Sequence, residues 1–228
     1  KEPVNKLEIS LVRSWPPSKE FHSTLDEEHQ VYTKYQTKIH NDSLQECNIN
    51  QFKRFLCTSP LLNNAYEGPL LQKSYSNEKF QECSEISGNL NDLGYGSFHQ
   101  QYRLNGKLIA VGVIDILDHC VSSVYFFYDP EYHFLKLGTY SALREIALVR
   151  QLNKLDFNIK WYYLGFYVHN CRKMRYKGLY YPSYLLCPEV FTWHSLDSCI
   201  PILDKNKYSR FAPSVESESN NRDNNSVE

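Results

Sequence analysis

The 228-residue sequence predicts an α/β protein, of the α+β kind, built on one mixed β-sheet with helices on both faces. Asn105-Gly106 stands between two strand-like segments, and this pair is the strongest short signal of an antiparallel hairpin. A helical pattern at 138–153 lies between strand-like segments at 122–128 and 161–168, which predicts a right-handed crossover to a parallel neighbour. Hydrophobic residues make up 42% of the chain, so a sizeable core can form and wholesale disorder is excluded.

The elements on the N-terminal side follow from local patterns. The run LEISLV, within residues 1–13, predicts an edge strand that Pro16-Pro17 ends, because proline cannot donate to the ladder. Residues 26–40 predict an amphipathic helix, since apolar side chains recur four positions apart and acids fill its first turn. A second, short helix is expected at 51–57.

The middle and the end of the chain differ in polarity. Residues 63–94 are polar and interrupted by glycine, which predicts a long loop. Residues 108–117 are nearly all apolar and predict a central strand buried on both faces. Residues 213–228 predict a disordered acidic tail, and residues 1–212 are expected to form one domain. The tail holds four acids and one base, so the totals of 26 acids and 25 bases become 22 and 24 without it, a net charge of +2.

Several protein classes are excluded by what the sequence lacks. No apolar run approaches the ~18 residues that a membrane helix needs, so no membrane partner is expected. The glycine-rich dinucleotide and P-loop motifs do not occur. Seven cysteines at wide spacings, without a C-x-x-C pair, predict reduced thiols inside the cell rather than disulfides or a metal site. The chain begins at Lys1 without Met, and we expect it to be a piece of a longer protein.

Seven segments of the sequence resemble one known family. They are FKRFLCTSPL at 52–61, GYGSFHQQY at 94–102, NGKLIAVGVIDIL at 105–117, SSVYFFYDPEY at 122–132, LGTYSALREIAL at 137–148, YYLGFYVHNC at 162–171 and KMRYKGLYYPSYLLCPE at 173–189. Together they resemble the C-terminal domain of eukaryotic arginyl-tRNA–protein transferase, and the resemblance runs from about Leu7 to Phe211. It implies a GNAT-like acyltransferase fold, in which central strands splay and admit an acyl donor.

The resemblance also implies an activity and its partners. The family moves arginine from arginyl-tRNA to the α-amine of proteins that begin with Asp, Glu or oxidised Cys, and the products are recognised for degradation. The implied partners are arginyl-tRNA and acidic protein N-termini, and the implied enzyme is a monomer of the cytoplasm and nucleus. The family's N-terminal domain binds a metal or an iron–sulfur cluster through a Cys-Gly-Tyr-Cys motif and a Cys-Cys pair. Neither motif occurs in this sequence, so no cofactor is expected here. Asp118 and Arg172 depart from the family pattern, which has proline at both positions.

Three residues are candidates for catalysis. Asp115 is a carboxylate within a strand predicted to be buried, and an uncompensated buried carboxylate is costly. It is expected to bind the substrate's α-ammonium or the arginyl group, or to take a proton; a structural carboxylate that caps backbone N–H groups or pairs with a base is the alternative. His99 and Tyr102 lie on the first arm of the hairpin and are expected to line the acceptor pocket, with ordinary sheet positions as the alternative.

Binding residues are expected where basic side chains gather. Residues 160–177 hold five bases and no acid, and such side chains can pair with a substrate carboxylate or with tRNA phosphates. The candidate substrate-binding residues are Tyr125, Arg144, Lys173 and Lys177. The candidate tRNA-binding residues are Lys53, Arg54, Arg172 and Arg175. A solvated basic loop is the alternative, and no metal ligands are expected.

Two other functions stay open at this stage. A coenzyme A-dependent acyltransferase would bind the pyrophosphate at residues 129–138, but the run HFLKLGTYSA shares only Gly138 with the usual signal of that site. A non-catalytic module that binds tRNA or protein N-termini would hold acidic peptides without turnover.

Overall fold

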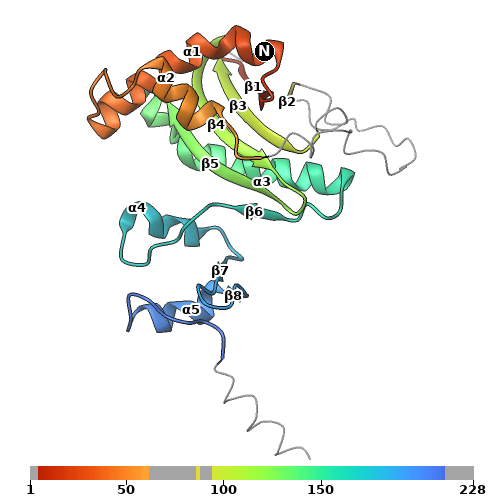
Figure 1. Ribbon diagram of the computed structural model, residues 1–228, viewed down its shortest axis with the longest axis vertical. Coiled ribbons are helices and arrows are strands. Elements are labelled where there is room, and N and C mark those ends of the chain that lie inside the picture. The colour runs from red at the N-terminus through yellow and green to blue at the C-terminus, as the bar shows by residue number, and fades with distance from the viewer. Residues whose placement is uncertain (1–4, 62–85, 88–93, 214–228) are drawn as a thin grey trace, which may run out of the picture. The chain divides into compact units, whose positions relative to one another are not determined.

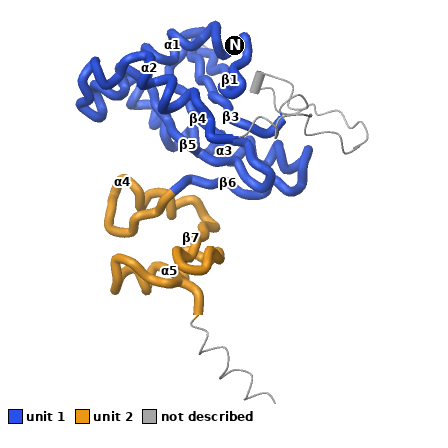
Figure 2. Tube along the Cα trace, viewed as in Figure 1, with its two compact units in different colours: residues 1–165 blue, residues 166–228 orange. Residues whose placement is uncertain are grey.

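The structure, a computed structural model, describes residues 5–61, 86–87 and 94–213. The chain divides into two compact units, residues 1–165 and residues 166–228, called unit 1 and unit 2 (Figure 2). The single domain that the sequence predicts over 1–212 stays a prediction, and the predicted tail lies outside the described residues from 214 onward.

Unit 1 is built on a six-stranded mixed sheet with the order β2-β1-β3-β4-β5-β6 (Figure 1). The strands are β1 Leu7–Trp15, β2 Ile86–Ser87, β3 Gly96–Leu104, β4 Lys107–Ile116, β5 Cys120–Tyr128 and β6 Trp161–Tyr163. The four strands from β1 through β3 and β4 to β5 pair antiparallel, whereas β2 on β1 and β6 on β5 pair parallel. The predicted mixed α/β sheet is therefore confirmed, and it has the antiparallel start and parallel crossover of an acyltransferase-like fold.

The hairpin of β3 and β4 forms where the sequence predicts it. Asn105 and Gly106 both have positive φ angles, 50° and 84°, as a two-residue hairpin turn with the right twist requires. β4 is buried over most of its length, which confirms the predicted central strand. Its side chains alternate between the two faces: Val111 and Val113 belong to one core cluster, Ile114 and Ile116 to another.

One face of the sheet is covered by the N-terminal helices (Figure 1). These are α1 Lys19–Tyr35, the π-helix η1 Gln36–His40, α2 Ile49–Phe52 and the π-helix η2 Lys53–Cys57. Helix α1 begins earlier than the predicted residue 26, because the Ser18 side chain caps it and accepts from the Phe21 N–H at 3.1 Å. The short helix predicted at 51–57 is confirmed in place, with its start at Ile49.

The opposite face is covered by α3 Leu137–Leu155, which follows the 3₁₀ helix η5 Pro130–Leu135 (Figure 1). Leu148, Val149 and Leu152 of α3 pack against the strands. The prediction of helices on both faces is thus confirmed. The last strand is shorter than the predicted 161–168, since β6 ends at Tyr163.

The first strand ends at Trp15, directly before the two prolines, as expected. The prediction that it forms the sheet edge is wrong, because Ile9 and Ser10 pair with Ile86 and Ser87 of β2. Sequence periodicity does not reveal so short a strand within a polar stretch. Most of the loop predicted at 63–94 lies outside the described residues.

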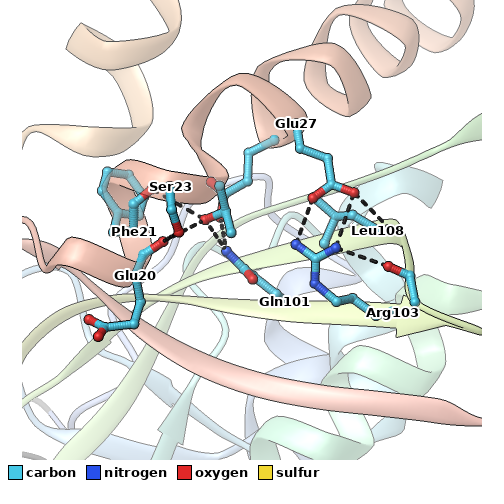
Figure 3. A network of polar contacts seen from close by, with 10 residues as sticks. Glu20, Phe21, Ser23, Glu27, Gln101, Arg103 and Leu108 are labelled. Atoms are coloured by element: carbon cyan, nitrogen blue, oxygen red, sulfur yellow. Dashed lines mark hydrogen bonds and ion pairs between the residues drawn. The ribbon is translucent and has the colours of Figure 1, made fainter.

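A polar layer fixes α1 onto β3 (Figure 3). The Arg103 guanidinium donates to both carboxylate oxygens of Glu27, at 3.1 and 2.6 Å, and the Leu108 N–H donates to the same carboxylate at 3.2 Å. Gln101 donates to the Thr24 hydroxyl at 2.7 Å. These bonds set the position of α1 along β3, because they join side chains of the helix to side chains and backbone of the sheet.

Unit 2 is small and has little regular structure. Its elements are α4 Arg172–Arg175, the 3₁₀ helix η6 Tyr176–Leu179, the antiparallel pair β7 Tyr184–Leu186 and β8 Trp193–Ser195, and α5 Leu196–Leu203. Cys187, Leu196 and Cys199 are buried. The His169 Nε2 donates to Asp204 Oδ1 at 2.8 Å, and its Nδ1 lies 2.9 Å from the Tyr167 hydroxyl. Within the described part of the chain, no helix is long and apolar enough to cross a membrane.

Candidate active site

The sheet opens where β5 and β6 part. The two strands pair only through Cys120–Trp161, Val121–Tyr162 and Ser122–Tyr163. Beyond Ser122, no strand in the described ranges pairs with this edge of β5. We call the point of separation, formed by Ser122, Ser123, Tyr162 and Tyr163, the β5/β6 junction. The β4–β5 register shifts beside the same point, because Val113 pairs with Tyr125 and Ile114 with Ser123, which leaves Val124 of β5 as the extra, bulged residue.

Asp115 lies at this junction on the face covered by α1 and η2. It stands opposite Ser122 in the β4–β5 register. The Ser97 hydroxyl donates to its Oδ1 at 2.5 Å, and the Ser59 hydroxyl lies 2.6 Å from that of Ser97. Burial raises the pKa of Asp115, and the bond from Ser97 offsets only part of the rise. No base pairs with Asp115 in the described ranges, and its functional role stays a prediction.

A second carboxylate, Glu145, lies at the junction on the opposite face. It projects from α3 and is 1% exposed. The Tyr162 hydroxyl of β6 donates to its Oε2 at 2.6 Å, and the Ser141 hydroxyl donates to its Oε1 at 2.8 Å. Burial raises the pKa of Glu145, while hydrogen bonds from Tyr162, Ser141 and Ser123 act in the other direction.

Sequence reasoning does not single out Glu145, although a signal for it exists. Ala142, Glu145, Val149 and Leu152 recur at helical spacing along the buried stripe of α3. A carboxylate within an apolar stripe is either a structural group whose hydrogen bonds are satisfied or part of a functional site. Its hydrogen-bond partners become known only once the strands that face α3 are known.

His99 lies on the α1 face and is fully buried. Its Nδ1 lies 2.5 Å from Glu28 Oε2, and its Nε2 lies 2.9 Å from the Leu56 carbonyl oxygen. Burial acts to lower the pKa of His99, but the Glu28 carboxylate and the two hydrogen bonds outweigh it, so the pKa is raised. Because both ring nitrogens are engaged, this geometry fits a residue that holds α1 and η2 on the sheet; the predicted catalytic role gains no support from it.

Tyr102 lies on the other face from His99, because three positions separate them along the strand. It is 1% exposed, and its hydroxyl donates to Gln100 Oε1 at 2.6 Å. Burial raises its pKa, and the charge of Arg144 on α3 offsets part of that rise. Tyr102 and Arg144 therefore lie near Glu145 rather than near Asp115, so the structure divides the predicted catalytic residues between two faces.

Tyr125 lies on the α1 face of β5, beyond the junction. Its hydroxyl donates to Gln36 Oε1 at 3.0 Å, and its ring packs against that of Phe55 at 5.2 Å. Burial raises its pKa. This position on the free part of β5 is consistent with the substrate-binding role predicted for it, which stays a prediction.

The predicted tRNA-binding residues are exposed. Lys53 and Arg54 lie on η2 in unit 1, where Arg54 donates to Gln51 Oε1 at 2.7 Å. Arg172 and Arg175 lie on α4 in unit 2. The two pairs belong to different units.

The two lysines predicted to bind substrate differ in their surroundings. Lys173 is exposed on α4. Lys177 is half-buried, its Nζ donates to the Phe166 carbonyl at 2.8 Å, and burial lowers its pKa. Lys173 is therefore the better placed of the two to meet a carboxylate from solution.

The described residues include no cluster of side chains suited to bind a metal. In residues 5–61, 86–87 and 94–213, no group of three or more His, Cys, Asp or Glu side chains could hold a metal ion. The six described cysteines are free thiols. These residues do not fit a metal or an iron–sulfur cluster, and no step of the chemistry is assigned to one.

Comparison with known proteins gives one consistent result. The family model "Arginine-tRNA-protein transferase, C terminus" matches residues 27–187. Arginyl-tRNA--protein transferase 1 of Drosophila melanogaster is 47% identical over 208 residues, which are 90% of this chain and 38% of that protein. The Arabidopsis thaliana protein of the same name is 45% identical over 203 residues, 89% of this chain and 28% of that protein. The Dictyostelium discoideum protein is 49% identical over 150 residues, 65% of this chain and 23% of that protein. The chain thus spans less than two fifths of these relatives, and it belongs to the arginine-tRNA-protein transferase family as a match to its C-terminal region.

Proposed function

We propose that this chain is the part of an aminoacyltransferase that moves arginine from arginyl-tRNA to the α-amine of proteins beginning with Asp, Glu or oxidised Cys. The observation that carries the proposal is the family match across 27–187, on a chain 47% identical to a protein named for that reaction. We expect the enzyme to act as a monomer in the cytoplasm and nucleus, and its products to be recognised for degradation.

The main task of the protein in this reaction is to hold the two reactants in position. The aminoacyl ester of tRNA is already activated, and an N-terminal α-amine has a pKa near 8, so part of it is neutral at physiological pH. The amine attacks the ester carbonyl, a peptide bond forms, and the bond to the terminal ribose oxygen of tRNA breaks. The α-ammonium loses one proton before attack and the nitrogen loses a second as the peptide bond forms. The ribose oxygen gains one proton as it leaves, so one proton is released overall. Holding the two reactants together supplies much of the rate.

Asp115 is the group we assign to the incoming amine. It lies at the β5/β6 junction, is half-buried, and receives one hydrogen bond, from Ser97. The carboxylate can bind the α-ammonium and take its proton, and a raised pKa brings it closer to the pKa of the amine. The exposed bases Lys53 and Arg54 of unit 1, and Arg172 and Arg175 of unit 2, would bind tRNA phosphates. Lys173 of unit 2 is a candidate for binding an acidic side chain.

The test is transfer of labelled arginine from arginyl-tRNA to a peptide that begins with Asp, with a peptide that begins with Lys as the control. The full-length parent protein is expected to label only the acidic peptide. Absence of transfer by the full-length protein would refute the proposal. Stabilisation by acetyl-coenzyme A together with no arginine transfer would instead support a coenzyme A-dependent enzyme.

Asp115→Asn separates function from folding in the same assay. We expect kcat to fall about 100-fold, the lower end of what a proton-transfer group contributes. Because burial raises the pKa of Asp115, its ionised form costs folding free energy at neutral pH, so Tm is expected to stay constant or rise. Glu131→Gln, at a carboxylate that is 73% exposed, is the matched control and should change neither quantity. Equal activity of Asp115→Asn and the wild type would remove Asp115 from the mechanism.

A further inference from the structure

Glu145 is a buried carboxylate that forms no ion pair among the described residues. Its carboxylate accepts from the hydroxyls of Ser141 and Tyr162, and Ser123 adds a third neutral partner. In the part of the chain that the structure describes, no Lys, Arg or His forms an ion pair with it. Hydroxyls supply hydrogen bonds but no charge, and a buried carboxylate without a counter-charge is costly.

The strand beneath Glu145 is shaped to receive this carboxylate. A Cβ at Gly112 of β4 would lie 3.0 Å from Glu145 Oε1, which is tighter than ordinary contact. The same Cβ would lie 3.8 Å from the Gln100 side chain, so Gln100 and Glu145 are neighbours across Gly112. A glycine here allows the carboxylate to lie directly on the strand.

Gln100, beside Glu145, has a polar atom whose hydrogen bonding is not satisfied. It is fully buried, its Oε1 accepts from the Tyr102 hydroxyl, and its Nε2 has no hydrogen-bond partner among the described residues. Buried polar atoms are almost always satisfied, so an unsatisfied amide beside a carboxylate without an ion pair indicates a site that a ligand completes.

The β5/β6 junction lies directly beside this site. Ser123 is the first residue of β5 beyond the last pair with β6, and Tyr162 lies on β6 next to that pair. Both are half-buried, whereas Glu145 behind them is 1% exposed. Asp115, on the other face, stands opposite Ser122 at the same point. Two carboxylates therefore flank the junction from the two faces of the sheet.

We propose that Glu145 binds the guanidinium group of the arginyl donor and is the residue that selects arginine. This inference rests on the proposed function. A guanidinium carries five N–H donors, is more weakly hydrated than an ammonium, and sits at the end of a stem of three methylene groups. It can therefore reach a deep carboxylate, whereas the α-ammonium of a protein N-terminus is held close to its own backbone. The half-buried Asp115 is the better match for that ammonium.

The test uses two stable probes, a 3′-amino-adenosine carrying arginine through an amide bond and the same compound carrying citrulline. Citrulline keeps the shape of arginine and lacks its charge. The full-length wild-type protein is expected to bind the arginine probe about 10- to 100-fold more tightly, the range for a hydrogen bond to a charged group. Glu145→Gln should abolish this preference by weakening the arginine probe alone, and Glu131→Gln should preserve it.

A second variant tests the same point without removing the charge. Gly112→Ala places a methyl group against Glu145 Oε1 and should displace the carboxylate, so it is expected to reduce the preference for arginine while the citrulline probe binds as before. Equal weakening of both probes by Glu145→Gln, with a lower Tm, would assign Glu145 a structural role and overturn the inference. If Glu145→Gln raises the KM for the acceptor peptide and leaves the binding of both probes unchanged, Glu145 binds the α-ammonium, which would also overturn the inference. Loss of arginine transfer in the wild type, with probe selectivity intact, would refute the proposed function and leave the guanidinium site standing.

Discussion

His99 and Glu28 form an ion pair with no exposed surface, and this pair sets the stability of the α1 face. The pKa of His99 is raised in the folded protein, so the stability it contributes is fully present below its unfolded pKa of about 6.5. That stability is lost as the pH rises through the raised pKa of the folded state. Gln101, which donates to the other oxygen of Glu28 at 2.7 Å, holds the pair in place.

Replacing Glu28 by Gln is expected to destabilise the protein by about 3–5 kcal/mol at pH 6, because it leaves a buried imidazolium without its counter-charge. The loss should shrink at pH 9, where the imidazole can be neutral in both states. Urea unfolding at the two pH values measures it. Glu27→Gln breaks the neighbouring, half-exposed pair with Arg103 and should cost less than about 1 kcal/mol. Equal losses at both pH values would show that His99 is neutral in the folded protein.

At the residue scale, the sequence predicts Asp115 but not its counterpart Glu145. Asp115 stands out because a single carboxylate interrupts a continuous apolar run. Glu145 follows Arg144 in a helix that carries charged residues at several positions, so it does not stand out in the sequence. Its burial follows only from the strands that α3 packs on. His99 and Tyr102 are close in sequence, yet strand alternation places them on opposite faces, a consequence visible once the strand itself is known.

At the element scale, the two-residue turn and the start of α3 use glycine for different reasons. Gly106 has a φ of 84°, where a side chain is strained, although a Cβ there would meet no atom within 4 Å. Gly138 lies in the first turn of α3 at an ordinary φ and also has open space around it.

The same substitution should therefore have opposite effects at the two positions. Gly106→Ala is expected to destabilise the protein by about 1 kcal/mol through backbone strain. Gly138→Ala is expected to stabilise it by about 0.5–1 kcal/mol, since alanine loses less conformational entropy in a helix. Thermal unfolding of both variants beside the wild type is the measurement. Stabilisation at both positions would mean that the turn relaxes out of its positive φ.

Elements with a local signal are predicted well, and elements that depend on distant contacts are not. The Asn105-Gly106 turn and the apolar spacing of α3 act within a few residues, and both are found in place. The two-residue strand β2 exists only through its pairing with β1, and β6 ends where its pairing with β5 ends. The residues of these strands alone therefore do not predict the presence of β2 or the end of β6.

At the scale of the whole molecule, charge is distributed unevenly. A net charge of −1 conceals exposed bases on α4 in unit 2 and on η2 in unit 1. Overall charge therefore does not reveal this local excess of bases, whereas the count over 160–177 does. The sequence also does not predict the division into two units, because the residues around the boundary between Gly165 and Phe166 do not have the composition of a linker.

Removing two of these bases should change the salt dependence of tRNA binding. For the double variant Arg172→Ala, Arg175→Ala in the full-length protein, we expect the slope of log K against log salt to fall by about 1.4–1.8, which corresponds to two lost phosphate contacts. Binding measured between 50 and 200 mM salt (~4-fold range) gives the slope. The control is the double variant Lys205→Ala, Lys207→Ala, which removes two exposed bases of the same unit that lie outside residues 160–177. It should leave the slope unchanged. An unchanged slope in the first variant, with a raised KM for acidic peptides, would assign these arginines to the acceptor.

The open edge of β5 also bears on how the protein behaves in storage. From Ser123 to Tyr128 the edge reads SVYFFY, with no charge, proline or glycine, which is the composition of segments that stack into fibrils. Val124, 49% exposed, is the place where one lysine would interrupt such stacking. Val124→Lys should slow the growth of light scattering in concentrated solution, whereas Val190→Lys, at a comparably exposed valine of unit 2, should not. The open edge beside the proposed site is thus also where we expect self-association of the isolated chain to begin.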